Sequence, residues 1–279
     1  MNYYFLFIFL QTVSAFSSNP LSNPKGLPIH FAKKIFLQEK NDTTLKNKTL
    51  NYAGRKGRDG FSGSKGSKGE SGRKFSGIDG GVGGKGSKGS DGKDGLNGAN
   101  IHLTLEKIKK TEFTDSLLRI IIFNTSNQKK DTVYIQPENE TLTIDVTGGD
   151  GGNGGKGANG GEGGDGYLTF NASNTSQGIG GDGGNGGDAG FGGNGGDGGN
   201  VTIFFADNAR VYLPIITIIN TGGKNGKAGK YGYGGKPGSV GNGVKNKRPN
   251  GRNGQNGQVA QNGSYGRNGT VQYVAILAN

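Results

Sequence analysis

Gly148-Gly-Asp-Gly-Gly-Asn-Gly-Gly-Lys156 opens a tract in which two of every three residues are glycine. A second tract of this kind starts at Gly180-Gly-Asp-Gly-Gly-Asn-Gly-Gly-Asp188 and continues to Asn200. The repeating unit is Gly-Gly-X, and X is mostly Asp or Asn. Because glycine has no side chain to bury, neither tract can fold around an apolar core of its own. Any fixed structure of these tracts must come from their backbones.

Glycine also recurs with a period of three in four further tracts. The period is interrupted at Arg73-Lys-Phe-Ser76, and Ala260 takes one glycine place. The six tracts are nearly equal in length and span 54–72, 77–98, 148–166, 178–200, 223–241 and 251–269. Disordered low-complexity sequence has no reason to keep matching lengths, whereas rods packed side by side do.

A backbone with three residues per turn would place these glycines along one edge of an extended helix. Such a helix rises about 3.1 Å per residue, so each tract would span on the order of 55–65 Å. It has no internal hydrogen bonds, and ordering its glycines costs conformational entropy. We therefore expect the tracts to be stable only as a laterally paired bundle. Since a Gly-Gly-X helix has two bare edges, we expect two layers of three rods, with 148–166 and 178–200 in the centre.

The segments between the tracts have the composition of β-strands. Ile101-His-Leu-Thr-Leu and Leu142-Thr-Ile-Asp-Val alternate between apolar and polar residues. Further strands rich in β-branched and aromatic residues are expected from Leu117, Thr132, Tyr167, Val201, Val211 and Thr270. A helix across 105–118 is an alternative for that stretch. The predicted fold is mainly β with non-regular structure: strands of a sheet or sandwich that feed about six polyglycine-II or polyproline-II helices in two layers.

The N-terminus predicts secretion. Phe5-Leu-Phe-Ile-Phe-Leu10 is a short apolar core, and Val13-Ser-Ala15 has the small residues of a cleavage site. We expect a signal peptide at 1–15, cleaved after Ala15, and no membrane span after cleavage; the alternative is an uncleaved anchor. The remaining predicted parts are a linker or propeptide at 16–53, collagen-like rods at 54–98, a β-strand segment at 99–147, and rods alternating with strands at 148–279, with 54–279 forming one domain.

The chain carries a formal net charge of +12, and its basic residues are grouped. For a secreted chain, nucleic acid is an improbable partner, and anionic glycans or other matrix proteins are the expected ones. The predicted contacts lie in two basic loops near the ends of tracts: Arg73, Lys74, Lys245, Lys247, Arg248 and Arg252. A homo-oligomer is also compatible with the repeats.

Asn-X-Ser/Thr sequons are frequent in the sequence. In a secreted eukaryotic protein they are candidate glycosylation sites. They begin at Asn41, Asn47, Asn124, Asn139, Asn171, Asn174, Asn200, Asn262 and Asn268.

The sequence offers no reactive constellation. It has no cysteine and two histidines, and His102 stands in an alternating strand without a visible partner. We predict a protein that is not an enzyme, with no cofactor, no metal and no catalytic residue. The Gly-Gly-X pattern is related to calcium-binding nonapeptide repeats, but it repeats every three residues and lacks their apolar position. Tyr231, Tyr233 and Tyr265 could serve sugar stacking or adhesion, and the alternative is that they cap or flank the rods.

The repeats resemble those of known glycine-rich families. Residues 54–98 have the glycine period of collagen, although no proline occupies their X or Y positions. Gly148-Gly-Asp-Gly-Gly-Asn-Gly-Gly-Lys156 is similar to mycobacterial glycine-rich repeats, phage tail-tip adhesins and springtail antifreeze proteins. The resemblance to the last two implies a bundle of polyglycine-II helices for about half of the chain.

These features predict a secreted structural protein of an extracellular matrix, wall or surface coat. The first alternative is an adhesin that binds anionic glycans or cell surfaces through its basic loops. The second alternative is a collagen-like trimer.

Overall fold

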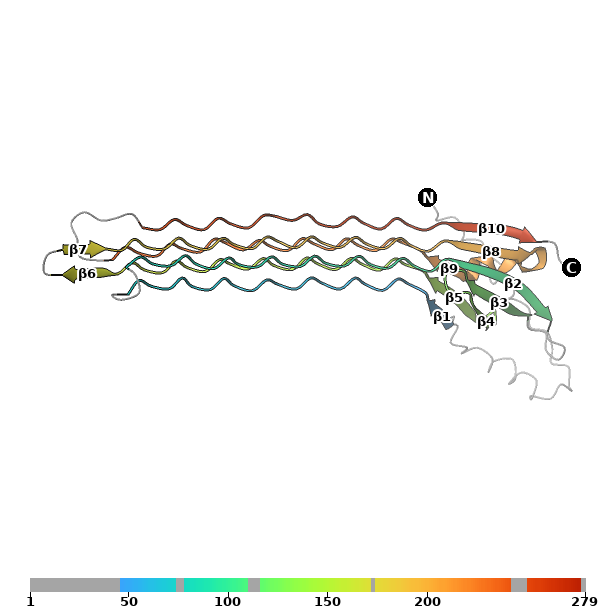
Figure 1. Cartoon of the computed structure of the whole chain (residues 1–279). Coiled ribbons are helices and arrows are strands. Elements are labelled where there is room, and N and C mark those ends of the chain that lie inside the picture. Colours follow the sequence, from blue (N-terminus) through green and yellow to red (C-terminus); the bar gives the residue numbers. More distant parts are fainter. Residues whose placement is uncertain (1–45, 74–77, 110–115, 172–173, 242–249, 277–279) are drawn as a thin grey trace, which may run out of the picture. The chain divides into compact units, whose positions relative to one another are not determined.

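A computed structural model describes residues 46–73, 78–109, 116–171, 174–241 and 250–276, all within one unit, Leu45–Asn279. The described residues are mainly β, and 4% of them are helical. The predicted mainly β class is therefore confirmed. Strands gather at one end of the described unit, and long glycine-rich segments run from them side by side (Figure 1).

Two sheets form the strand-rich end. The first is parallel and has the order β1 (Lys46–Asn51), β5 (Glu140–Asp145), β9 (Ile216–Ile219). The second has the order β10 (Val271–Ile276), β8 (Val201–Ala206), β2 (Ile101–Lys109), β3 (Ser116–Asn124), β4 (Lys129–Ile135). In it β10, β8 and β2 are parallel, and β3 and β4 continue the sheet in antiparallel pairing.

The apolar core lies between these two sheets. Alternating residues of β2, β3 and β8 meet those of β5 in one buried cluster. Leu103, Ile120, Ile144 and Ile203 are at most 1% exposed. Fully burying each such side chain contributes roughly 1.5–3 kcal/mol, so most of the apolar stabilisation of the described residues resides here.

The structure corrects two local predictions. The residues on either side of the undescribed 110–115 belong to β2 and β3, so the helix across 105–118 is wrong for the described residues. The strand expected from Val211 to Ile219 is wrong for its first half, because residues 211–215 belong to a 3₁₀-helix, η1 (Asp207–Ile215), that contains Pro214. Proline lacks the N–H that a strand ladder needs. The second half of that strand is confirmed as β9 (Ile216–Ile219).

The structure also differs within 16–53, which the sequence presents as a linker or propeptide. The end of this range contains β1, whose six residues pair in parallel with β5. Residues 1–45, including Asn41 and the expected signal peptide, lie outside the described residues.

Six glycine segments connect the strands, and neither helix nor strand is assigned within them. We number them by their described residues: segment I (54–72), II (80–98), III (148–166), IV (178–200), V (222–241) and VI (251–269). Segments I, III and V follow β1, β5 and β9, whereas II, IV and VI precede β2, β8 and β10. At the other end of the segments, β6 (Leu168–Asn171) and β7 (Asn174–Gln177) pair as a hairpin between III and IV (Figure 1).

Backbone hydrogen bonds join each segment to the next and to the next but one. The bonds between consecutive segments are antiparallel, for example Gly184 N–H to the oxygen of Gly161 at 2.8 Å. Those between alternate segments are parallel, for example Gly154 N–H to the oxygen of Lys227 at 2.8 Å. Segments I, III and V thus form a first row, and II, IV and VI a second row. Segments III and IV each bond to four neighbours.

The donors of segment III change direction with a period of three. Gly154 donates to Lys227 of segment V and Gly155 to Ser90 of segment II, both at 2.8 Å. Asn153 N–H donates to the side chain of Asp59 in segment I at 2.8 Å. Around Asn153, successive residues therefore bond to three different neighbours. The two glycine directions repeat along the segment, for example Gly151 N–H to the oxygen of Lys224 and Gly152 N–H to that of Lys93, both at 2.8 Å.

The close approach of the segments requires glycine. A Cβ at Gly154 would lie 2.1 Å from the carbonyl oxygen of Gly190, and one at Gly186 would lie 2.0 Å from that of Gly232. No methyl group fits at these distances without moving a backbone. Ala158 does occupy one such place, and its N–H to Ser87 bond is 3.0 Å long, against 2.8 Å at neighbouring Gly155.

Replacing an inner glycine should therefore destabilise the fold strongly. We expect Gly154→Val or Gly186→Val to cost about 2–4 kcal/mol of unfolding free energy, because the side chain separates two hydrogen-bonded backbones. Thermal and denaturant unfolding monitored by circular dichroism measures this. Lys65→Val is the control at an exposed X position and should change stability by about 0.5 kcal/mol or less. Equal effects at inner and exposed positions would contradict the packing described above.

Candidate functional site

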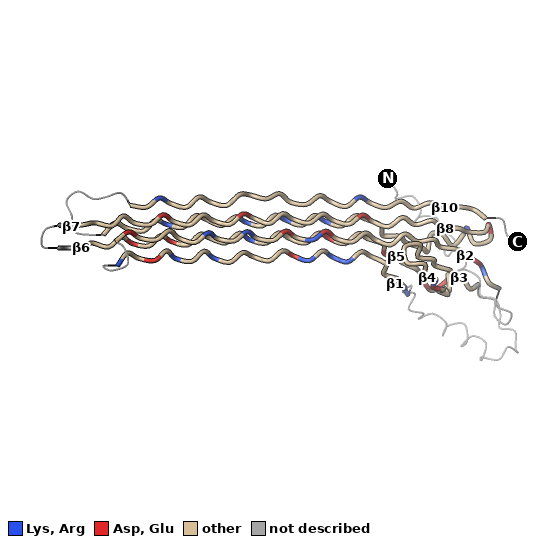
Figure 2. The backbone as a smooth tube through the Cα atoms, viewed as in Figure 1, with Lys and Arg blue, Asp and Glu red and all other residues tan. Residues whose placement is uncertain are grey.

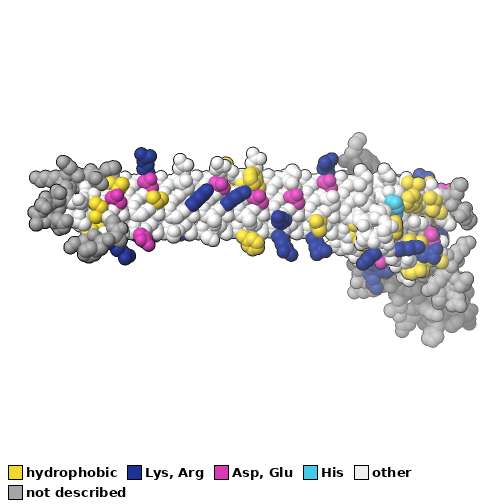
Figure 3. Space-filling view, viewed as in Figure 1, with side chains coloured by type: hydrophobic (Ala, Val, Ile, Leu, Met, Phe, Trp, Pro, Cys, Tyr) yellow, Lys and Arg dark blue, Asp and Glu magenta, His cyan; other side chains and the backbone are white. Residues whose placement is uncertain are grey.

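The X residues of the segments carry nearly all the side chains of this region. In the space-filling view, charged groups are spaced along a surface made mostly of backbone and small polar side chains (Figure 3). Positive and negative residues are interspersed along the segments (Figure 2). The candidate functional surface is therefore the array of X residues on each row.

Asp and Asn side chains link segments within a row. In the second row, Asn185 accepts from the N–H of Gln255 at 2.8 Å, and Asn194 accepts from that of Ser264 at 2.8 Å. In the first row, Asp150 accepts from Lys224 N–H at 2.7 Å. A short side chain that ends in a carbonyl or carboxylate oxygen suits this reach, which accounts for the recurrence of Asp and Asn at X.

The pKa values of two of these carboxylates, Asp59 and Asp91, are lowered. Accepting the backbone N–H of Asn153 lowers the pKa of Asp59, and Lys56 at 3.5 Å lowers it further. Accepting the N–H of Phe191 lowers the pKa of Asp91, and Lys88 at 3.4 Å contributes. Both side chains are exposed, so these shifts report local hydrogen bonding to the charged form rather than burial.

The first row carries a column of lysines on segment V, which we call the lysine column: Lys224, Lys227, Lys230 and Lys236. All four are exposed, and none takes part in the ion pairs found among the described residues. The register of the row places Asn153 beside Lys227 and therefore Lys156 beside Lys230. The middle of this column thus faces no carboxylate on segment III.

In the second row, unlike in the lysine column, several cations lie close to carboxylates. Arg252 and Arg267 of segment VI lie in register with Asp182 and Asp197 of segment IV, whose side chains accept their backbone N–H groups. Lys88 of segment II pairs with Asp91 and lies 5.4 Å from the centre of the Phe191 ring. These three cations of the second row therefore stand next to acidic groups.

Aromatic residues lie beside the lysine column. Tyr231 and Tyr233 have ring centres 5.6 Å apart in an edge-to-face arrangement, and Tyr233 is 61% exposed. Tyr265 of segment VI is also exposed. Tyr231 and Tyr233 therefore flank the middle of segment V, whereas Tyr265 lies near the end of segment VI that continues into β10. Asn262 accepts from Ala228 N–H at 2.8 Å, so this edge also presents amides.

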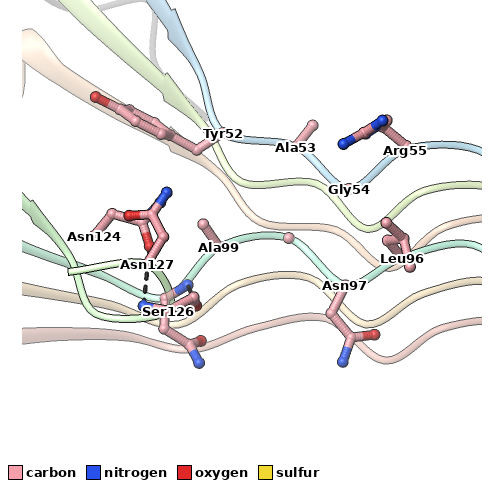
Figure 4. A pocket seen from close by; sticks show the side chains of 12 residues that line it. Tyr52, Ala53, Gly54, Arg55, Leu96, Asn97, Ala99, Asn124, Ser126 and Asn127 are labelled. Atoms are coloured by element: carbon pink, nitrogen blue, oxygen red, sulfur yellow. Dashed lines mark hydrogen bonds between the residues drawn. The ribbon is translucent and has the colours of Figure 1, made fainter. Parts of the chain in front are cut away.

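A pocket of about 490 Å³ opens where segments I and II meet the sheets (Figure 4). Its lining is mostly backbone, small side chains and amides, with Tyr52 and Arg55 as the titratable groups among the described residues. Burial and a 3.0 Å hydrogen bond to Asp131 raise the pKa of Tyr52 to about 12. The Tyr52 phenol therefore stays protonated at neutral pH and serves as a donor.

The predicted basic contacts are only partly described. Arg73 ends segment I and is exposed, and Arg252 is exposed near the start of segment VI. Segments I and VI share no hydrogen bond among the described residues, so the structure does not bring these two together. Lys74, Lys245, Lys247 and Arg248 lie outside the described residues.

The sequons lie in different environments. Asn47, Asn139, Asn200, Asn262 and Asn268 are exposed, and the Asn200 and Asn268 side chains accept backbone N–H groups from Thr270 and Gly222. Asn124 is 7% exposed and accepts from Ser126 N–H. Asn171 and Asn174 end the two strands of the β6–β7 hairpin. Glycan occupancy stays a prediction.

The described residues contain no cluster of three or more His, Cys, Asp or Glu residues that could hold a metal, and no helix with the length and apolar character of a membrane span. His102 is exposed on β2 and packs edge-on against the Phe204 ring at 5.6 Å.

Comparisons with protein-family models, curated proteins and solved structures found no match. The resemblance to glycine-rich bundle families therefore stays a prediction. Sequence reasoning missed the linking role of the Asp and Asn side chains, although their regular recurrence at X was a signal for it.

Removing side-chain links should weaken the second row. We expect Asn185→Ala with Asn194→Ala to cost about 2 kcal/mol, because each deletes an acceptor worth about 1 kcal/mol. Asn185→Asp with Asn194→Asp keeps the acceptors and should stay close to the parent in denaturant unfolding. Lys85→Ala, at an exposed position without a hydrogen bond, is the matched truncation control. If the alanine pair unfolds like the control, the links contribute nothing to stability.

Acid should destabilise the protein partly through Asp59 and Asp91. Their folded pKa values lie below the ordinary value, so their contribution is full above that value, near 3.9, and is lost as the pH falls through the folded pKa. We expect Tm to decrease between about pH 5 and pH 2. Asp59→Asn with Asp91→Asn keeps both acceptors without titrating, so its Tm should decrease less. Parallel Tm profiles for parent and variant would contradict this assignment.

Proposed function

We propose that the six glycine segments are polyglycine-II helices packed in two layers of three. The observation that carries this proposal is the period-three change of donor direction in segment III, where Gly154 and Gly155 bond to different neighbours. A helix with three residues per turn directs successive N–H groups about 120° apart, which accounts for this pattern. The four neighbours of segments III and IV favour the central places for the two Gly-Gly-X tracts.

The same bonds favour a single-chain bundle over a collagen-like trimer. Segment III finds donors and acceptors on segments I, II, IV and V of its own chain. In a collagen-like trimer, the glycines of each segment would pack against two other chains. Since the main-chain groups are already paired within one chain, a second chain is not needed to satisfy them.

A bundle of this kind is suited to a mechanical or spacing role. Its inner backbone groups are bonded on several sides, and its ends are anchored in the sheets whose strands continue into the segments. Bending it would break many lateral bonds together. We therefore propose that the chain is a non-enzymatic structural protein of an extracellular matrix, wall or surface coat. The apolar N-terminal stretch and the sequons are the sequence support for the extracellular setting.

One experiment tests both parts of the proposal. The full chain is expressed in a eukaryotic secretory host, and the secreted product is analysed by mass spectrometry, sedimentation and small-angle X-ray scattering. We expect cleavage after Ala15, a monomer, and a scattering profile typical of an elongated particle. A trimer would refute the single-chain bundle, retention inside the cell would refute the extracellular role, and a random-coil profile would refute the packed fold.

A further inference from the structure

The lysine column carries an inference beyond a structural role. Its middle part contains Lys227 and Lys230, with Lys156 in register on segment III. Asp150 and Glu162 lie on segment III before and after this part, and none of the three X residues between them is acidic. The three ammonium groups form no ion pair among the described residues. This leaves a concentrated, uncompensated positive surface on a rigid frame.

Lys156 stands at a position of segment III where the X residue usually accepts a backbone N–H of segment V. At Asp150, Asn153, Asn159 and Asp165, segment III accepts a backbone N–H of segment V. Lys156 and Glu162 are the X residues between them that do not accept such a bond. Of the two, Lys156 is a cation and has no side-chain oxygen with which to accept the N–H of Lys230. Positions that break a local rule are candidates for function. Lys88 breaks the same rule in the second row, but Asp91 pairs with it and the Phe191 ring lies near it.

The surroundings of these lysines match a sugar polymer better than a simple polyanion. Tyr231 and Tyr233 lie in the same stretch of segment V, and the exposed Tyr233 ring offers an apolar face. The C–H faces of sugar rings pack on such surfaces, while ammonium groups bind carboxylates or sulfates. The column repeats about every 9 Å, which suits a linear ligand that presents its charges at intervals.

We propose that Lys156, Lys227 and Lys230, with Tyr231 and Tyr233, form a binding surface for an acidic polysaccharide. The polymer lies along segment V, its anionic groups contact the lysines, and its rings pack against the tyrosines. This surface lies along the middle of the segments rather than at the basic loops near their ends. The inference rests on the proposed extracellular setting, where such polymers occur.

The test measures binding of defined probes to the full secreted chain. Fluorescence anisotropy with labelled polygalacturonate and heparin fragments gives affinities over a range of salt concentrations. We expect Lys156→Gln, Lys227→Gln and Lys230→Gln together to weaken binding about tenfold and to reduce the slope of log K against log salt by about 2. The matched control removes three cations elsewhere, by Lys85→Gln, Lys93→Gln and Arg267→Gln. It should change affinity less than twofold.

A second pair of variants tests the sugar component. Tyr231→Ala with Tyr233→Ala should weaken polygalacturonate binding severalfold, whereas Phe61→Ala with Tyr265→Ala, which removes exposed rings outside the stretch, should not. Equal losses in the lysine variant and its charge-matched control would overturn the site. Equal affinity for polyglutamate and polygalacturonate would overturn its assignment to polysaccharides. Melting curves of the same variants report separately on the bundle, so failure of binding is distinguishable from failure of the proposed fold.

Discussion

The fold of the described residues depends on the lateral hydrogen bond between two glycine-bearing backbones. Gly184 N–H reaches the oxygen of Gly161 at 2.8 Å. A Cβ at the adjacent Gly160 would lie 1.9 Å from the oxygen of Gly184, so segments III and IV can approach this closely only because that position is glycine. Each such bond contributes about 0.5–1.5 kcal/mol net, while ordering a residue costs about 1–2 kcal/mol. A single pair of segments is therefore not stable alone. Stability requires that inner segments bond on several sides and that the sheets hold their ends.

The same constraint links the glycine segments to the sheet topology. Parallel strands need long crossover connections, which are usually helices. Here the route from β1 to its parallel partner β5 runs out along segment I and back along segment II, then through β2, β3 and β4. Each row of segments continues into three parallel strands, so the register of the row and that of the sheet reinforce each other. The apolar core between the sheets supplies the burial that the glycine segments lack.

Periodicity made much of this arrangement predictable. The glycine period located all six segments, and alternation in Ile101-His-Leu-Thr-Leu located β2. Features that depend on distant partners were not predictable. β1 is a polar strand that exists because β5 lies beside it, and Pro214 diverted an apolar run into η1. The links made by Asn185 and Asn194 required knowledge of which segments are neighbours.

The glycine and X positions of the repeat are under different constraints, which explains how such a scaffold could carry the proposed binding surface. Glycine positions are constrained by backbone contact, and an Asp or Asn at X is constrained on one side by the N–H that it accepts. An X residue without that role, such as Lys230, has an exposed side chain that no hydrogen bond among the described residues constrains. Its charge can therefore change without disturbing the packing, which makes the lysine column the part of the segments freest to match a ligand. A cation at Lys156 costs at most one link of about 1 kcal/mol. The surrounding lateral bonds make that loss tolerable. The proposed recognition therefore falls on X residues that make no link, whereas the glycines and the linking Asp and Asn residues stabilise the packing.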